Sequence, residues 1–419
     1  MKKTSLMLLA ALLALSACTS KDKKVDKPAE LTDLKNPTVH VQKLWSASVG
    51  GGGKKLRLGL GLASADNRLF AAGRDGEIAA FDLKTGKQIW KVDTKLALAG
   101  GTGVGSDVVA VGSADGVVVV LAAADGAQRW RAEVKGEVLS APAISATEVV
   151  VRTVDGKLRG LALADGKEVW SAEQQVPKLS LRGVAAPVVA HDVAISGFDN
   201  GRVLAINIAD GATVWESPVS PSHGRTELER LNDIDAAVKV SGDDVFVVGF
   251  QGRAAMLALD SGQIWWAHDL SSYRGVDVDD DQVYVSTSAG EVVALKRRSG
   301  IEVWRNDSFK LRALSAPVVA GDYVAVADLD GYVHWLDRTT GDLVGRIKTG
   351  GDRVTNAPIV VDGIVYVISD KGDVIALHGL PIEGRAAKVE QAAPPVLTPA
   401  AAPVAPASGA DGPTRAPGG

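Results

Sequence analysis

Residues 75–90 read DGEIAAFDLKTGKQIW, and the same outline returns at residues 115–130 as DGVVVVLAAADGAQRW. Each of these two stretches opens at a turn glycine, carries a second turn glycine ten residues later, and ends at a tryptophan. The first glycine recurs eight times along the chain, at positions 76, 116, 156, 201, 252, 290, 331 and 372. Such a regular period indicates one supersecondary unit that is repeated and stacked on its neighbours.

Each unit is predicted to be a four-stranded antiparallel meander. Asp-Gly and Asn-Gly pairs between β-branched residues are hairpin signals, because a type I′ turn needs a positive φ at both central residues. One strand fits between the two glycines, another carries the tryptophan, and two apolar runs precede the first glycine. Several runs, including residues 117–121, are apolar at every position, which indicates strands buried on both faces. The sequence therefore predicts an all-β fold, an eight-bladed β-propeller.

Two further patterns place the innermost strands and the ring closure. Proline cannot donate to a strand ladder and belongs on an edge, such as the strand that lines a propeller channel. Four prolines lie fourteen residues before a first glycine, at positions 142, 187, 317 and 358. Trp45 precedes the first full unit, and the eighth unit has no tryptophan strand after it. Residues 41–49 are therefore expected to supply the outer strand of blade eight, while Gly345 replaces the tryptophan of blade seven.

The N-terminus predicts export and a lipid anchor. Lys2 and Lys3 precede a short apolar run, and small residues lead to Cys18, which is the chain's one cysteine. This pattern indicates a signal peptide over residues 1–17. The cysteine at the cleavage point resembles a bacterial lipoprotein box, which implies acylation of Cys18. Because Thr19 rather than aspartate follows, the resemblance implies anchoring in the cell outer membrane, facing the periplasm. The alternative is an ordinary signal peptide with an incidental cysteine.

The domain organisation follows from these boundaries. Residues 18–40 are polar and lysine-rich, which predicts a flexible, lipidated tether. The propeller is expected over residues 41–380. Residues 381–419 are rich in proline and alanine and are expected to form a disordered tail.

Composition excludes several classes of function. The formal charge is −4 and no basic stripe is present, so nucleic acid is not an expected partner. A single cysteine excludes an intrachain disulfide. The six histidines are scattered over different blades without metal-ligand spacing, and no phosphate loop occurs. No catalytic residue, cofactor or metal is therefore predicted.

Two blades break the repeat spacing, and a binding site is predicted there. Blade five has the longest spacing and blade four the next longest, with the additional residues near Leu179, Leu181 and Arg182 and before Asp233 and Asp235. Insertions in a propeller map to loops, which often form one binding face. Arg182 and Asp233 each lie nineteen residues before the first glycine of their blade.

This spacing assigns Arg182 and Asp233 to equivalent positions on neighbouring blades. The same count places Arg57, Arg312 and Arg353 at the equivalent position of three other blades. Arginine beside leucine is a typical binding anchor. The alternative is that Arg182 and Asp233 pair across the blades and join the two loops, and both roles are compatible.

The repeat resembles that of the pyrroloquinoline quinone dehydrogenases, whose unit also ends in Thr-Gly followed by tryptophan. The resemblance covers structural positions of the blade alone. The adjacent cysteine pair of those enzymes is impossible in a chain with one cysteine. A quinone-dependent periplasmic dehydrogenase therefore stays an alternative rather than the leading hypothesis.

Residues 179–183 and 224–235, LSLRG and GRTELERLNDID, carry a more specific resemblance. Over roughly residues 40–380, and in its lipoprotein signal, the chain resembles the BamB family of the outer-membrane β-barrel assembly (BAM) complex. The resemblance implies a non-enzymatic scaffold that binds the periplasmic domains of BamA and assists delivery and insertion of unfolded outer-membrane proteins. It also implies partner contacts by Leu179, Leu181, Arg182, Asp233 and Asp235. A propeller lipoprotein with another periplasmic partner is a further alternative.

Overall fold

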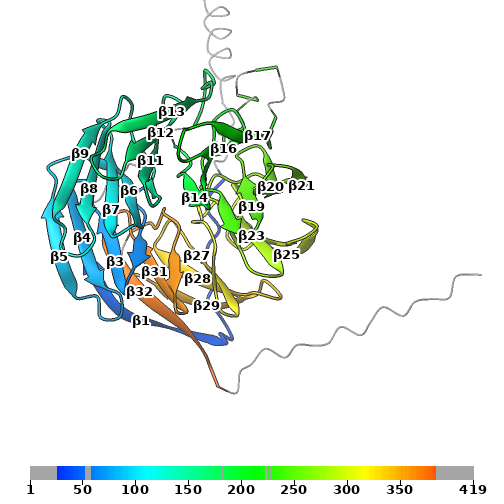
Figure 1. Cartoon of the computed structure of the whole chain (residues 1–419). Helices are drawn as coiled ribbons and strands as arrows, with labels where there is room; N and C mark the ends of the chain where they lie inside the picture. Colours follow the sequence, from blue (N-terminus) through cyan, green and yellow to red (C-terminus); the bar gives the residue numbers. More distant parts are fainter. Residues whose placement is uncertain are drawn as a thin grey trace, which may run out of the picture.

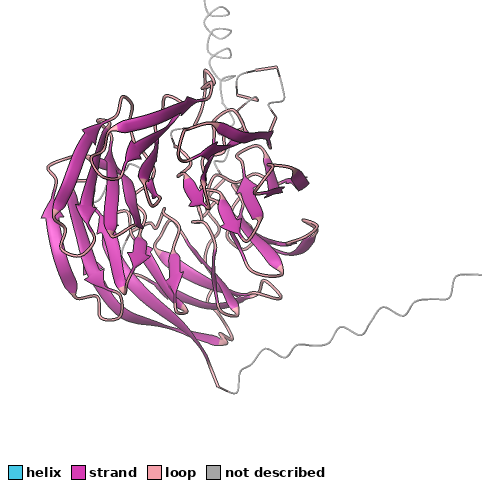
Figure 2. Cartoon of the chain, viewed as in Figure 1, coloured by secondary structure: helices cyan, strands magenta, loops and turns pink. Residues whose placement is uncertain are grey.

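The computed structural model describes residues 26–51, 58–181, 183–221, 225–226, 228–229, 231–350 and 352–383. The described part consists of strands joined by turns and loops, without helices, as Figure 2 shows. The strands form eight four-stranded antiparallel sheets arranged as a ring (Figure 1). The predicted eight-bladed β-propeller is confirmed.

The blades follow the chain in order, and each starts with its innermost strand. Blades one to four contain β2 (Ala63–Ala65), β3 (Arg68–Ala72), β4 (Glu77–Asp82) and β5 (Gln88–Asp93); β6 (Leu98–Gly105), β7 (Val108–Ser113), β8 (Val117–Ala122) and β9 (Gln128–Glu133); β10 (Ala143–Ile144), β11 (Glu148–Arg152), β12 (Lys157–Ala162) and β13 (Glu168–Glu173); and β14 (Val188–Ala190), β15 (Val193–Gly197), β16 (Arg202–Asn207) and β17 (Thr213–Pro218).

Blades five to eight contain β18 (Lys239–Ser241), β19 (Asp244–Val248), β20 (Arg253–Ala258) and β21 (Ile264–Asp269); β22 (Val276–Val278), β23 (Gln282–Ser286), β24 (Val292–Lys296) and β25 (Glu302–Asn306); β26 (Val318–Ala320), β27 (Tyr323–Ala327), β28 (Tyr332–Asp337) and β29 (Leu343–Lys348); and β30 (Ile359–Val361), β31 (Ile364–Ile368), β32 (Asp373–Pro381) and β1 (Val39–Ser48).

The innermost strands surround the centre of the ring. The first strands of neighbouring blades contact one another, as β18 contacts β22 and β22 contacts β26. The four register prolines at positions 142, 187, 317 and 358 come directly before β10, β14, β26 and β30. Their predicted place at the channel is confirmed, because the start of an edge strand needs no proline N–H.

The hydrophobic core lies between the blades. Among the described residues, eight apolar clusters form, and each combines side chains from two adjacent sheets. Every residue of β8 is buried, which confirms the expectation from its unbroken apolar run. No blade covers both of its own faces, so stability depends on the complete stack.

The repeated tryptophan and second glycine form one contact between neighbouring blades. The indole N–H of Trp90 donates to the carbonyl of Ala123 over 3.0 Å, and six other outer-strand tryptophans make the same bond to the next blade. The second turn glycine packs under the indole: a Cβ on Gly126 would lie 2.8 Å from Cε3 of Trp90. Gly126 also has a φ of 76°, so both the close approach of the indole and the positive φ require glycine at this position.

The ring closes as predicted, through an N-terminal outer strand. β1 pairs antiparallel with β32 and completes blade eight, with Trp45 opposite Ala376 (Figure 1). The structure also explains Gly345. A Cβ at this position would lie 3.0 Å from Cβ of Val39, so the start of β1 occupies the space that a tryptophan would need.

Residues 26–38 differ from the prediction of a flexible tether over residues 18–40. This segment, called the strap, lies along blade seven before β1 begins at Val39. The N–H of Ala29 donates to Lys310 over 2.9 Å, and its carbonyl accepts a 2.9 Å bond from the guanidinium of Arg312. Farther along, Arg346 donates to the carbonyl of Thr32 over 2.8 Å. These bonds to backbone groups hold a polar segment that has little apolar surface of its own.

Three predictions lie wholly or mostly outside the described residues. They are the signal peptide over residues 1–17, acylation of Cys18 and the tail over residues 381–419. The described chain ends at Glu383, just after β32.

Candidate functional site

The propeller has two faces that carry different loops. The connection face carries the turns at the eight first glycines and the connections from one blade to the next, such as residues 307–317. The hairpin face carries the other two turns of each blade, such as residues 66–67 and 83–87. Both insertions of blades four and five lie on the connection face.

The backbone confirms the register that places Asp233. The N–H of Phe250 donates to the carbonyl of Asp233 over 2.8 Å, and the corresponding bond links Leu329 to Arg312 and Asp370 to Arg353. In blade one, however, Arg74 donates to Gly51 rather than to Arg57. Gly51 therefore takes this register in blade one, and Arg57 itself lies outside the described residues.

Asp233 joins the two inserted loops. The backbone N–H of Leu181 donates to Oδ2 of Asp233, which lies fifty-two residues away on the neighbouring blade. The side chain of Asp233 is 0% exposed. Its carboxylate therefore positions the loop that carries Leu179 and Leu181 instead of presenting charge to solvent.

Asp235 lies directly beside the same loop. A Cβ on Gly183 would lie 3.2 Å from Oδ2 of Asp235, so the glycine permits the close approach of the two loops. Burial is the largest cause that raises the pKa of Asp235, to about 8, and the charges of Asp233 and Asp199 add to it. Burial likewise raises the pKa of Asp233, to about 7.

A buried arginine lies beneath these carboxylates. Arg152 is almost fully buried, lies 3.3 Å from Oδ1 of Asp199, and stacks 4.2 Å above the ring of Phe198. Its charge lowers the pKa of Asp199 and Asp235 against the larger effect of burial. Sequence reasoning missed Arg152 and Asp199, although a charged residue at the end of the apolar run of β11 was a visible signal.

The accessible part of the site is apolar. Leu179 is 42% exposed and Leu181 is half-buried, whereas Arg182 lies outside the described residues. Leu228, in the insertion of blade five, is 65% exposed. It was not among the predicted site residues, so the accessible surface is wider than the sequence suggested.

A capping box shapes the turn that presents Leu228. The carboxylate of Glu229 accepts the N–H of Arg225 over 2.8 Å and that of Thr226 over 3.1 Å. The N–H of Glu229 donates in return to the hydroxyl of Thr226 over 3.2 Å. The Thr-x-x-Glu spacing is the sequence signal that predicts this turn.

The arrangement suits recognition of a macromolecule. The described residues contain no cluster of three potential metal-ligating side chains. Within the same residues, no helix is long and apolar enough to cross a membrane. The two loops offer exposed leucines beside buried carboxylates, one of which accepts the N–H of Leu181. Exposed apolar patches with a polar surround mark protein-interaction surfaces.

The chain is similar to one family over almost the whole propeller. The family model described as outer membrane protein assembly factor BamB matches residues 42–93, 74–306 and 288–381. The outer membrane protein assembly factor BamB of Pseudomonas aeruginosa is 50% identical over 369 residues, which cover 88% of this chain and 97% of that protein. Its counterpart in Alkalilimnicola ehrlichii is 45% identical over 378 residues, or 90% of this chain and 97% of the relative.

Solved structures agree with this similarity. The crystal structure of BamB from Moraxella catarrhalis superposes with a TM-score of 0.75 at 30% identity, covering 81% of this chain and 100% of that one. A quinohemoprotein alcohol dehydrogenase from Comamonas testosteroni superposes with a TM-score of 0.63 at 13% identity, over 80% of this chain and 76% of the enzyme. The second likeness shows the shared propeller fold alone.

Proposed function

The chain belongs to the BamB family of outer membrane protein assembly factors, and from this premise we propose that it is a non-enzymatic scaffold lipoprotein of outer-membrane β-barrel assembly. In this role it binds the periplasmic domains of a BamA-like barrel protein and assists the delivery and insertion of unfolded outer-membrane proteins. The observation that carries the proposal is the joined pair of loops on the connection face.

The proposed partner site divides into a contacting and a supporting part. Leu179, Leu181 and Arg182 contact the partner, with Leu228 as an additional apolar contact. Asp233 and Asp235 support them from below, because Asp233 is buried and accepts the N–H of Leu181. Burying two or three leucines against a partner is a typical centre for a protein interface.

The proposed lipid anchor fits the path of the strap. From Cys18 to Asp26 an extended chain spans at most roughly 30 Å. Because Ala29 is held at Lys310 and Arg312, the chain leaves the propeller at the connection face. Acylation of Cys18 would hold this face toward the outer membrane from the periplasmic side, close to the periplasmic domains of a barrel protein.

Affinity capture from outer membranes tests the proposed function. We expect the tagged full-length chain, solubilised in mild detergent with its membrane, to retain a BamA-like barrel protein through washing. A parallel capture with Cys18→Ser separates the lipid anchor from the protein contact, since the partner should still bind in detergent. Recovery of no barrel assembly protein in either capture would contradict the proposal.

Reversing the charge of Arg182 tests the site itself. We expect Arg182→Glu to weaken partner binding by about 2 kcal/mol or more, as for an interface hot spot, with little change in Tm. Isothermal titration and a thermal melt measure the two quantities. A large fall in Tm without a specific loss of binding would instead assign Arg182 to loop joining.

A further inference from the structure

A second groove lies on the hairpin face, opposite the site described above. It has a volume of about 920 Å³ and is formed by blades four, five and six. Val214 and Trp265 line it from the outer strands β17 and β21, and Leu259 lines it from a turn of blade five. The groove shares no lining residue with the inserted loops, so a ligand here leaves the connection face free.

Trp265 is the unusual side chain of this groove. In each outer strand a β-bulge leaves one residue outside the ladder, directly before the core tryptophan or, in blade seven, before Gly345. Trp265 is this residue in blade five and lies between the pairs of Trp266 and Ile264. At this position the other blades have smaller residues, namely Leu44, Ile89, Arg129, Val169, Val214, Val303 and Val344. Trp265 is 56% exposed, although its neighbour Trp266 is buried in the core.

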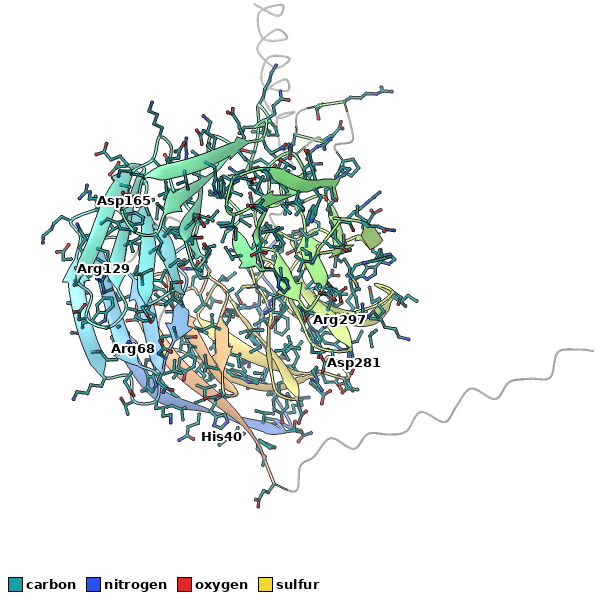
Figure 3. All side chains as sticks on the ribbon, viewed as in Figure 1. His40, Arg68, Arg129, Asp165, Asp281 and Arg297 are labelled. Carbon is teal, nitrogen blue, oxygen red and sulfur yellow. The ribbon has the colours of Figure 1, made fainter. Side chains whose placement is uncertain are left out.

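The polar rim of the groove is acidic. Asp192, Asp243 and Asp260 are exposed, and none of their carboxylates has a hydrogen bond or ion pair to another described residue. Asp244 differs, because it is buried and pairs with Arg297 over 3.0 Å and with Arg298 over 3.2 Å. Figure 3 labels Arg297 and Asp281 close together, and the backbone N–H of Arg297 donates to the Asp281 carbonyl over 2.8 Å.

Arg298 lines the groove with a side chain that is 75% exposed, and it shares the carboxylate of Asp244 with Arg297. Together with the three exposed aspartates, this leaves the rim with an excess of negative charge. An anionic ligand is disfavoured by this rim, and a neutral apolar ligand would leave the three carboxylates unused. The negative charge of the rim thus favours a cationic partner, while the exposed side chains of Trp265 and Val214 favour a partner with large apolar side chains.

We propose that this groove binds an extended polypeptide segment in which lysine or arginine alternates with large apolar side chains. The apolar side chains pack on Val214 and Trp265, and the cations lie at Asp243, Asp260 and Asp192. A lysine or arginine placed over the exposed indole gains a cation–π contact as well. Alternation suits the site because successive side chains of an extended chain point to opposite sides.

Fluorescence anisotropy with labelled synthetic peptides tests the proposal. The full-length chain carries Cys18→Ser, so that no acyl group competes for the groove. We expect a peptide of alternating lysine and phenylalanine to bind, and its glutamate–phenylalanine counterpart to bind at least about tenfold more weakly because of the acidic rim. Added salt should weaken the first interaction.

Two variants locate the binding in the groove. We expect Trp265→Ala to raise the Kd of the lysine peptide by about tenfold or more, since an aromatic anchor is lost. Asp243→Asn combined with Asp260→Asn should raise it and reduce its salt dependence. The matched control is Val169→Ala, which removes an exposed side chain at the same bulge position of blade three and should leave the Kd unchanged.

The outcomes separate clearly. If Trp265→Ala and Val169→Ala bind the lysine peptide like the parent chain, the groove is not the site and the proposal fails. Equal binding of the two peptides also overturns it. The assay contains no barrel protein, so its failure is distinguishable from failure of the proposed scaffold function.

Discussion

At the scale of single residues, the candidate site depends on carboxylates that the fold keeps from solvent. Asp233 and Asp235 were predicted to contact the partner directly, whereas the structure has Asp233 buried and bound to the backbone of Leu181. Whether a loop aspartate faces solvent or another loop depends on the tertiary path of both insertions. The spacing within one blade contains no information about the path of the other insertion. The register of Asp233 on its blade was therefore predictable from the sequence, and the burial of its side chain was not.

Asp235 gives the site a predicted pH dependence. Its pKa is about 8 in the folded chain against an ordinary value of 3.8, so the folded state binds the proton more tightly than the unfolded state. The free energy of unfolding therefore falls as pH rises from about 4 to about 8. We expect Asp235→Asn, which cannot ionise, to melt about 2–4 °C above the parent at pH 9 and with a smaller difference at pH 5.

Thermal melts of the parent and Asp235→Asn across this pH range measure the effect. A Tm difference that shrinks as pH rises would contradict the assignment. Asp269→Asn is the control for the substitution itself, since the side chain of this aspartate of blade five is exposed.

Two turn glycines, Gly341 after β28 and Gly363 between β30 and β31, give a prediction that separates backbone strain from packing. Gly341 and Gly363 both have a φ of 76°, but a Cβ on Gly341 would lie 2.4 Å from Trp304, whereas a Cβ on Gly363 would have no atom within 4 Å. We expect Gly363→Ala to lower the free energy of unfolding by about 1 kcal/mol through strain alone. Gly341→Ala should cost about 2 kcal/mol more, because the indole must move. Denaturant unfolding measures both, and equal costs would mean that the tryptophan contact adds nothing.

At the scale of elements, the strap shows the limit of composition as a guide. Residues 26–38 are polar and contain little apolar bulk, which predicted a flexible tether. Blade seven holds them mainly through Arg312 and Arg346, whose guanidinium groups donate to strap carbonyls. Every residue has a carbonyl, so the sequence of the strap gives no sign of these bonds. The repeat register does place Arg312 on the connection face, but not its partner.

Weakening the strap should release it without harm to the ring. Leu31 of the strap also packs on the apolar cluster between blades six and seven. We expect Leu31→Ser combined with Arg346→Ala to raise amide exchange at residues 29–38 by about tenfold, as for the loss of one or two local contacts. Exchange in the strands of blade seven should stay close to that of the parent. Arg305→Ala is the control, because Arg305 pairs with Glu291 and Glu302 on blade six and makes no bond to the strap. Unchanged exchange in the double variant would mean that these two side chains do not hold the segment.

At the scale of the whole molecule, the ring was predictable because each repeated residue meets a local physical need. Seven of the eight first glycines supply positive φ, while in blade five Gln251 has it in place of Gly252. The tryptophans join adjacent blades, and the prolines open the innermost strands. Gly345 was the exception that the sequence left unexplained. Its reason is contact with Val39, which lies 306 positions earlier and reaches blade seven only because the ring closes.

Closure of the ring is itself testable. We expect deletion of residues 39–48 to leave the edge of β32 unpaired and to cause oligomers or aggregates, since an exposed strand edge pairs with other chains. The Tm should fall as well, because β1 supplies Val39, Val41 and Trp45 to two inter-blade clusters. Light scattering and a thermal melt measure the two effects. A monomeric deletion variant that melts like the parent would disprove this closure.

We propose that the inserted loops of the connection face bind the assembly partner. The affinity of purified BamA-like periplasmic domains for two variants of the chain measures this binding. Leu179→Asp places a charge in the proposed contact, whereas Ile301→Asp places one at a similarly exposed position directly before the outer strand of blade six. We predict that Leu179→Asp weakens binding by about thirtyfold or more, as for a hot spot, and that Ile301→Asp binds like the parent. Equal affinities of the parent and Leu179→Asp would contradict it.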